Sequence, residues 1–149
     1  MINRFIGEYF FLCNFYEVPV TYEGITYLNN EAAFQAAKTT NNKIKHEFAS
    51  LGPSEAKRKG RSLKLREDWE EIKEQVMYEI CYAKFMQHPE LKEKLILTGK
   101  RPLVEGNTWN DKEWGTVNGE GNNKLGKILM KLREEFSNES EYWILFICE

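Results

Sequence analysis

"EAAFQAAK", residues 31–38, is the segment that decides the fold, because it places three polar side chains in an otherwise apolar stretch. Glu31, Gln35 and Lys38 are spaced i, i+4 and i+7, which aligns them along one side of an α-helix. Every other position of the segment is Ala or Phe. A helix that is apolar nearly all round is normally buried, so we predict that this helix lies inside the fold.

The polar line on this helix has two interpretations. Buried charges need partners, so Glu31 and Lys38 either pair inside the protein or line a cleft. In a cleft, the carboxylate of Glu31, the amide of Gln35 and the amine of Lys38 would all face a ligand. The spacing of the residues is compatible with both interpretations.

The flanking segments predict a helix-rich α+β protein with a small β-sheet. Two β-branched and aromatic runs around Glu23-Gly24 (residues 18–28) predict a hairpin, and Asn29 or Asn30 caps the helix that follows. Hydrophobic periodicity, caps and Gly or Pro stops predict further helices at 43–53, 54–60, 68–87, 90–99 and 124–136, and strands at 101–105 and 142–149. No repeat or linker interrupts the chain, which predicts a single domain over residues 1–149.

Composition excludes several classes of protein. The chain has 149 residues, 42% of them hydrophobic, and a net charge of −2, so nothing draws it as a whole toward nucleic acid or anionic lipid. We expect no signal peptide and no membrane span, since no apolar stretch approaches the roughly 20 residues that a span needs. Three scattered cysteines and two histidines predict no disulfide framework, no metal site and a cytoplasmic location. No cofactor or protein partner is evident.

The segment "WNDKEWGTVNGEGNNKLG", residues 109–126, combines two tryptophans with four glycines. Trp109, Trp114 and Asp111 are either ordinary loop residues over the core or part of a ligand platform. The glycines permit close backbone approach, and a helix that starts at Asn122 or Asn123 would offer free N–H groups to a phosphate. As a motif this is weak, because it lacks the full phosphate-loop pattern.

Two more places carry candidate residues. Asn14 lies between the aromatic residues of "FFLCNFY" (residues 10–16), and a buried amide there would need partners. The basic run "KRKGR" (residues 57–61) is either a solvated helix end or a phosphate contact, for which the forked donors of Arg61 are suited.

Together these segments resemble the YbiA-like family, also called the NADAR (NAD- and ADP-ribose-associated) domain. The resemblance spans nearly the whole chain. Its pieces are "FLCNFY" (11–16), Glu31 with Phe34-Gln35-Ala36 and Lys38, Gly60-Arg61, Arg66 with Asp68-Trp69, Val76-Met77, Lys84-Phe85, Leu103-Val104-Glu105, Asp111 with Trp114-Gly115, Gly121 with Asn123 and Leu125-Gly126, and Leu129-Met130 with Arg133. Cys13 stands where the family usually has serine, and residues 116–120 belong to a variable part of the family.

The resemblance implies cleavage of an N-glycosidic bond between ribose and a nitrogen base, without cofactor or metal. One branch of the family hydrolyses ribosylamino-pyrimidine phosphates of riboflavin synthesis, and another removes ADP-ribose from guanine in nucleic acid. The partner is accordingly a small phosphorylated ribosyl substrate or ADP-ribosylated guanine. Breaking the C1′–N bond builds oxocarbenium-like charge that a carboxylate stabilises.

The candidate site residues follow from these roles. The catalytic candidates are Glu31 and Asp111 as the carboxylates, and Lys38 as a nucleophile that forms a Schiff base with C1′. The substrate-binding candidates are Asn14, Phe15, Gln35, Arg61, Trp69, Trp114, Gly115, Gly121 and Asn123. Trp69 and Trp114 would wall the pocket, while Arg61 and the backbone of residues 121–123 would hold phosphate.

Two other classes of protein compete with the enzyme. A non-catalytic module that binds ADP-ribose or a nucleotide needs the tryptophans, Arg61 and the glycine loop, but not Glu31 and Lys38. A purely structural domain leaves the buried polar line unexplained. The presence of both Glu31 and Lys38 favours the enzyme.

Overall fold

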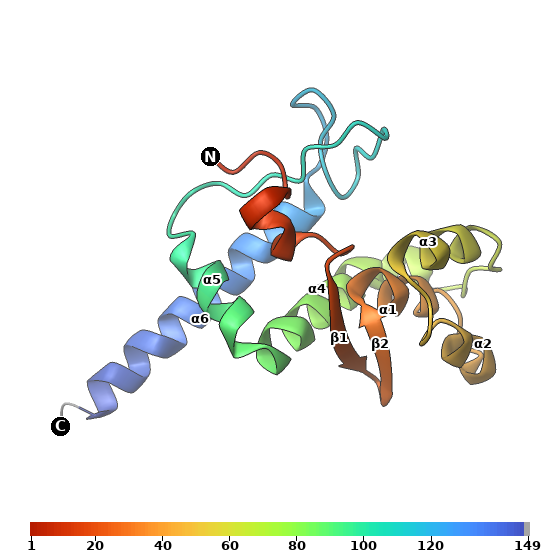
Figure 1. Cartoon of the computed structure of the whole chain (residues 1–149), viewed down its shortest axis with the longest axis horizontal. Coiled ribbons are helices and arrows are strands. Elements are labelled where there is room, and N and C mark those ends of the chain that lie inside the picture. Colours follow the sequence, from red (N-terminus) through yellow and green to blue (C-terminus); the bar gives the residue numbers. More distant parts are fainter. Residues whose placement is uncertain (148–149) are drawn as a thin grey trace. The chain divides into compact units, whose positions relative to one another are not determined.

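The computed structural model describes the backbone of residues 1–147 and the side chains of residues 1–139. The chain forms two compact units, one of residues 13–87 and the other of residues 1–12 together with the chain from His88 onward (Figure 1). The helices and the small antiparallel sheet confirm the predicted α+β class.

The unit of residues 13–87 holds the only regular sheet among the described residues, a hairpin followed by helices. Strands β1 (Glu17–Tyr22) and β2 (Ile25–Asn29) pair antiparallel. The turn between them places Glu23 and Gly24 at positive φ, 49° and 82°, as the predicted two-residue hairpin requires. The helices are α1 (Asn30–Ala36), α2 (Asn42–Glu47), α3 (Pro53–Arg61) and α4 (Trp69–Gln87).

Helix α1 is the buried centre of this unit, as predicted. All seven of its residues are buried, and it packs against the hairpin, α3 and α4. The Asn29 side chain caps it by accepting a hydrogen bond from the Ala32 N–H at 2.8 Å. The helix ends at Ala36 and is therefore shorter than the predicted polar line, which runs on to Lys38.

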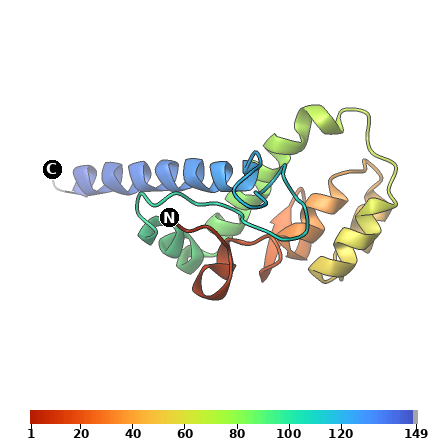
Figure 2. The same ribbon diagram turned by 90° about the horizontal axis from the view of Figure 1, so that it is seen from above.

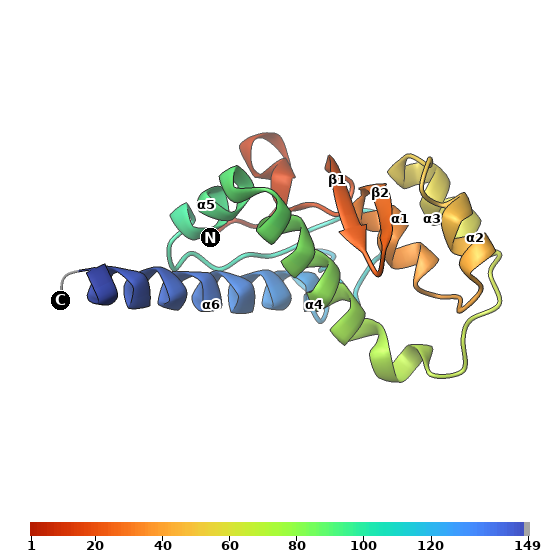
Figure 3. The same ribbon diagram turned by 90° about the horizontal axis from the view of Figure 1, so that it is seen from below.

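The second unit combines a short 3₁₀-helix, η1 (Gly7–Leu12), with α5 (Pro89–Leu97), a long loop and α6 (Lys124–Ile147). Helices α5 and α6 lie side by side (Figure 3). The predicted strand at 101–105 is wrong, because only Leu103 joins a β-bridge, parallel to Ile2. The core of this unit is aliphatic and aromatic and includes Phe5, Leu12, Leu95, Leu103, Leu129, Leu132 and Phe136.

Helix α6 corrects the predicted strand at 142–149. It continues without interruption to Ile147 (Figure 2), and residues 148 and 149, which include Cys148, lie outside the described part of the chain. No glycine or proline follows Gly126 to stop the helix, and a short apolar run suits a helix as well as a strand. Across the described residues, no helix combines the length and apolarity that crossing a membrane requires.

Candidate active site

Glu31 and Gln35 form a buried pair on α1. Their residues are 8% and 5% exposed, and Gln35 Nε2 donates a hydrogen bond to Glu31 Oε1 at 2.8 Å. The i, i+4 spacing of a helix brings the two side chains together. Part of the predicted internal pairing is therefore real, although the amide rather than the amine supplies this contact.

Gly60 of α3 makes room for the Gln35 amide. A Cβ atom at Gly60 would overlap the side-chain oxygen of Gln35, so this position admits only glycine while the amide stays in place. The same oxygen, Oε1, is buried and has no hydrogen-bond partner among the described residues. A buried amide oxygen without a partner lowers the stability of the fold, so its presence indicates a functional role.

Asn14 holds the start of α1. Its backbone carbonyl accepts the Glu31 N–H at 3.1 Å, and its side-chain Oδ1 accepts from Asn30 Nδ2 at 3.3 Å. The Asn14 Nδ2 group faces the Met77 sulfur at 3.3 Å. The amide expected to touch substrate is therefore occupied within the protein, and Asn14 is placed to position Glu31.

Lys38 lies in the turn after α1, one residue beyond the C-cap Ala37. Its N–H donates to the Gln35 carbonyl at 3.2 Å, and its own carbonyl accepts the Arg66 N–H at 2.9 Å. Lys38 is half-buried. The helix therefore ends before Lys38, and the turn that follows it closes onto Arg66.

Three other binding candidates of this unit differ in exposure. Trp69 is 5% exposed and packs against Phe34 with ring centroids 5.1 Å apart. Phe15 is half-buried, with the Lys57 ammonium 5.8 Å from its ring centroid. Arg61 is the exposed last residue of α3, as expected for either a solvated helix end or a phosphate contact.

Lys84 belongs to the quoted pair Lys84-Phe85 but was not among the predicted site residues. It is 1% exposed, its Nζ donates to the Cys13 carbonyl at 3.3 Å, and the Tyr16 ring centroid lies 5.4 Å away. Burial lowers the pKa of this amine to about 8. The sequence does indicate its burial, because Lys84 follows Met77 by seven residues and Ile80 by four, which places it on the same buried side of α4.

In the other unit, Asp111 organises the glycine loop. Its Oδ1 accepts the backbone N–H groups of Glu113 at 3.1 Å and Trp114 at 2.9 Å. Asn107, which the sequence interpretation also missed, brackets Asp111 by accepting its N–H at 3.0 Å and donating to its carbonyl at 2.8 Å. The Asp111 carboxylate therefore stabilises this turn, in addition to any catalytic role.

The N–H groups at the start of α6 are not free, which corrects the expected phosphate site. The N–H groups of residues 122–125 donate to the carbonyls of Lys112, Gly115, Glu113 and Trp114 at 2.7–3.2 Å. A Cβ at Gly115 would overlap the Glu105 carbonyl, and one at Gly121 would overlap that of Gly115. The glycines permit this close folding of the loop, so the chain itself takes the place expected for a ligand.

Asn123 and Trp114 complete this loop. Asn123, at φ 49°, accepts the Glu105 N–H and donates to the Leu103 carbonyl, both at 2.9 Å. Trp114 is half-buried, with the Lys124 ammonium 5.8 Å from its ring. The candidates thus form two groups, one around Glu31 in residues 13–87 and one around Asp111 in the other unit.

The chain matches the NADAR domain family over residues 4–137. It is 43% identical over 130 residues to the N-glycosidase YbiA of Shigella boydii, which covers 85% of this chain and 81% of that protein. It is 33% identical over 136 residues to a riboflavin biosynthesis protein of Vibrio vulnificus, covering 89% of this chain and 37% of that one.

A solved structure agrees with these sequence matches. The NMR structure of the E. coli protein YbiA matches with a TM-score of 0.81 and 38% identity, covering 94% of this chain and 89% of that one. The chain therefore belongs to the NADAR domain family, and its helix-rich α+β fold is the fold of that structure.

Proposed function

We propose that this chain, an N-glycosidase of the NADAR family, hydrolyses the C1′–N bond between a phosphorylated ribose and a nitrogen base. The family match and the relatives named N-glycosidase support the reaction class. The Vibrio relative is named a riboflavin biosynthesis protein, which supports a substrate from that pathway, and we propose a ribosylamino-pyrimidine phosphate. The observation that carries the site is the buried Glu31–Gln35 pair on α1.

Glu31 has the chemistry that such a cleavage needs. As the C1′–N bond breaks, its electrons leave with the base and positive charge grows on the ribose ring. A carboxylate held away from water stabilises that charge more strongly than one in solvent. Water then adds its oxygen to C1′, and its proton balances the departing nitrogen. The bond from Gln35 and the backbone bond to Asn14 would keep the carboxylate oriented.

Asp111 and Lys38 have narrower proposed roles. The Asp111 Oδ1 atom accepts two backbone N–H groups, which orients its carboxylate, and we propose that this carboxylate activates water. As an alternative to direct attack by water, Lys38 would attack C1′ of the ring-opened glycosylamine and form an imine, the base leaves with its nitrogen protonated, and water then hydrolyses the imine to free the lysine and the sugar. Arg61, exposed at the end of α3, is our candidate for the substrate phosphate.

ADP-ribosylated guanine in nucleic acid is the alternative substrate within the same reaction class, and the same carboxylate would serve it. We also propose a cytoplasmic location, because Cys13 and Cys81 are free thiols in the structure.

The test measures release of reducing sugar, which is ribose 5-phosphate from a ribosylamino-pyrimidine phosphate and ADP-ribose from ADP-ribosyl-guanine as the second substrate. Glu31→Gln keeps the shape and removes the charge, so we expect a loss of at least ~100-fold in kcat with the melting temperature nearly unchanged. Glu17→Gln, at an exposed position of β1, is the matched control. Full activity of a stable Glu31→Gln protein would contradict the assignment, and no release from either substrate would contradict the function.

The Schiff-base role of Lys38 has its own test. Borohydride added during turnover reduces an imine to a stable adduct, which mass spectrometry locates. We expect sugar mass on the peptide that contains Lys38, and loss of both adduct and activity in Lys38→Arg. An active Lys38→Arg enzyme without adduct leaves only an electrostatic role for this lysine.

A further inference from the structure

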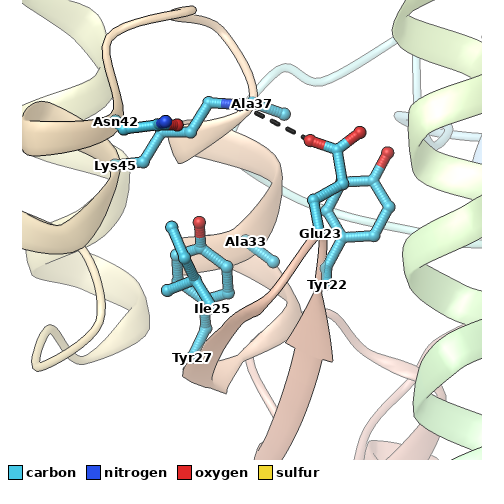
Figure 4. A pocket seen from close by; sticks show the side chains of 8 residues that line it. All are labelled: Tyr22, Glu23, Ile25, Tyr27, Ala33, Ala37, Asn42 and Lys45. Atoms are coloured by element: carbon cyan, nitrogen blue, oxygen red, sulfur yellow. Dashed lines mark hydrogen bonds and ion pairs between the residues drawn. The ribbon is translucent and has the colours of Figure 1, made fainter.

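The unit of residues 13–87 contains a small cavity that no step of the proposed reaction uses. It lies between the tip of the hairpin, α1 and α2, and has a volume of about 40 Å³ (Figure 4). Its lining is Tyr22, Glu23, Ile25, Tyr27, Ala33, Ala37, Asn42 and Lys45. Ala33 and Ala37 line it from a side of α1 roughly 200° around the helix from Glu31 and Gln35, so it is separate from the proposed catalytic face.

We propose that this cavity binds a small oxyanion, a carboxylate or phosphate group, between the Lys45 ammonium and the Tyr27 hydroxyl. The proposal is independent of the glycosidase reaction. It depends on three features of the cavity, namely a hydroxyl without a partner among the described residues, a largely enclosed cation and a carboxylate that already contacts that cation.

The Tyr27 side chain is buried, and its hydroxyl points into the cavity, where solvent reaches the oxygen. Tyr27 is 2% exposed, and Figure 4 shows its hydroxyl directed toward the Lys45–Glu23 pair. In the part of the chain that the structure describes, no group hydrogen-bonds to the hydroxyl of Tyr27 or of Tyr22. Burial raises the pKa of Tyr27 to about 12, so this hydroxyl keeps its proton and can donate it. The Tyr27 hydroxyl is therefore available to donate to a water or to a ligand in the cavity.

Lys45 is the enclosed cation. Its side chain is 12% exposed, and its Nζ lies 3.5 Å from Glu23 Oε2 across the top of the cavity (Figure 4). The Glu23 side chain is 60% exposed, so it can turn into solvent at little cost while Lys45 stays in place. We interpret the Glu23 carboxylate as a weakly held internal competitor for the position that an external oxyanion would take.

The size of the cavity selects the class of ligand. A water needs roughly 10–15 Å³ of such volume, so this space takes about three water-sized groups. A carboxylate, with three heavy atoms, fits without change, and a phosphate fits once Glu23 has turned outward. Both present oxygen acceptors to the two donors, Lys45 and Tyr27, and so share one chemistry.

The experiment is a titration of the ¹⁵N-labelled full chain with formate, acetate or inorganic phosphate, at constant ionic strength set with chloride. The amide shifts of Tyr27, Ala37 and Lys45 report on the cavity. A ligand of three to five atoms in such a site should bind with a dissociation constant of ~1 mM or weaker. Comparing formate with phosphate identifies whether the head group is a carboxylate or a phosphate.

The variants separate this site from general ion binding. Tyr27→Phe removes one oxygen atom and Lys45→Met removes the cation, so each should weaken binding about 10-fold or more. Glu23→Gln removes the competitor and should strengthen binding several-fold. Tyr82→Phe and Lys43→Met, at exposed positions, are the matched controls.

Two results would overturn the proposal. One is the absence of saturable shifts with all three anions, which would mean that the cavity holds water alone. The other is saturable binding that Tyr27→Phe and Lys45→Met leave unchanged, because the anion would then bind elsewhere.

Discussion

Replacing Lys84 by methionine tests the burial of this amine through the pH dependence of stability. Methionine keeps most of the length of the side chain and removes the charge. The structure places Lys84 at 1% exposure, with a pKa lowered from 10.5 to about 8 by desolvation. In the unfolded chain the pKa returns to its ordinary value, so the two states bind different numbers of protons between pH 8 and 10.5.

The sign follows from the lowered pKa. In this window the unfolded chain binds more protons, so the buried amine penalises folding fully below pH 8 and the penalty is lifted as pH rises toward 10.5. A shift of two to three pKa units corresponds to roughly 3 kcal/mol. We therefore expect the wild type to gain about 2 to 3 kcal/mol of unfolding free energy relative to Lys84→Met between pH 7 and pH 10.

The assay is urea unfolding followed by tryptophan fluorescence at several pH values. Burial raises the pKa of Cys81 to about 12, and the Lys84 charge acts against this shift, so Cys81 would titrate differently in the two proteins. Both proteins therefore also carry Cys81→Ala, and the difference between them is interpreted. Lys64→Met, at an exposed position, should show a flat difference from wild type. A flat difference for Lys84→Met as well would refute the argument that Lys84 is desolvated in the folded state.

Three further substitutions probe the site. Gly60→Ala should push the Gln35 amide away and lower kcat, while the melting temperature changes little because alanine favours the helix; unchanged kcat would mean that Gln35 does not position the catalytic carboxylate. Asp111→Asn keeps an oxygen that can accept the hydrogen bond from the Trp114 N–H, so we expect a loss of activity at constant stability because the charge is removed. Full activity would mean that Asp111 serves only to stabilise the turn. Trp114→Ala should raise KM while the melting temperature changes little. A large fall in the melting temperature, with normal substrate binding by the protein that stays folded, would make Trp114 a core residue.

Much of the fold could be predicted from the sequence, because it depends on neighbours along the chain. The hairpin follows from Glu23-Gly24, where two residues at positive φ select the turn. Helix α1 follows from its cap and its apolar surface, and its Glu31–Gln35 contact follows from helical spacing. These features depend on residues at most a few positions apart.

Other features were decided only by tertiary contacts. Lys84 occupies a buried position that its charge argues against, because the surrounding side chains and the Cys13 carbonyl enclose it. The sequence predicts free N–H groups for a phosphate at the start of α6, but the carbonyls of residues 112–115 accept hydrogen bonds from the N–H groups of residues 122–125. Local preferences determine which turn or helix a segment can form, whereas partners distant in the sequence determine which polar groups are left for a ligand.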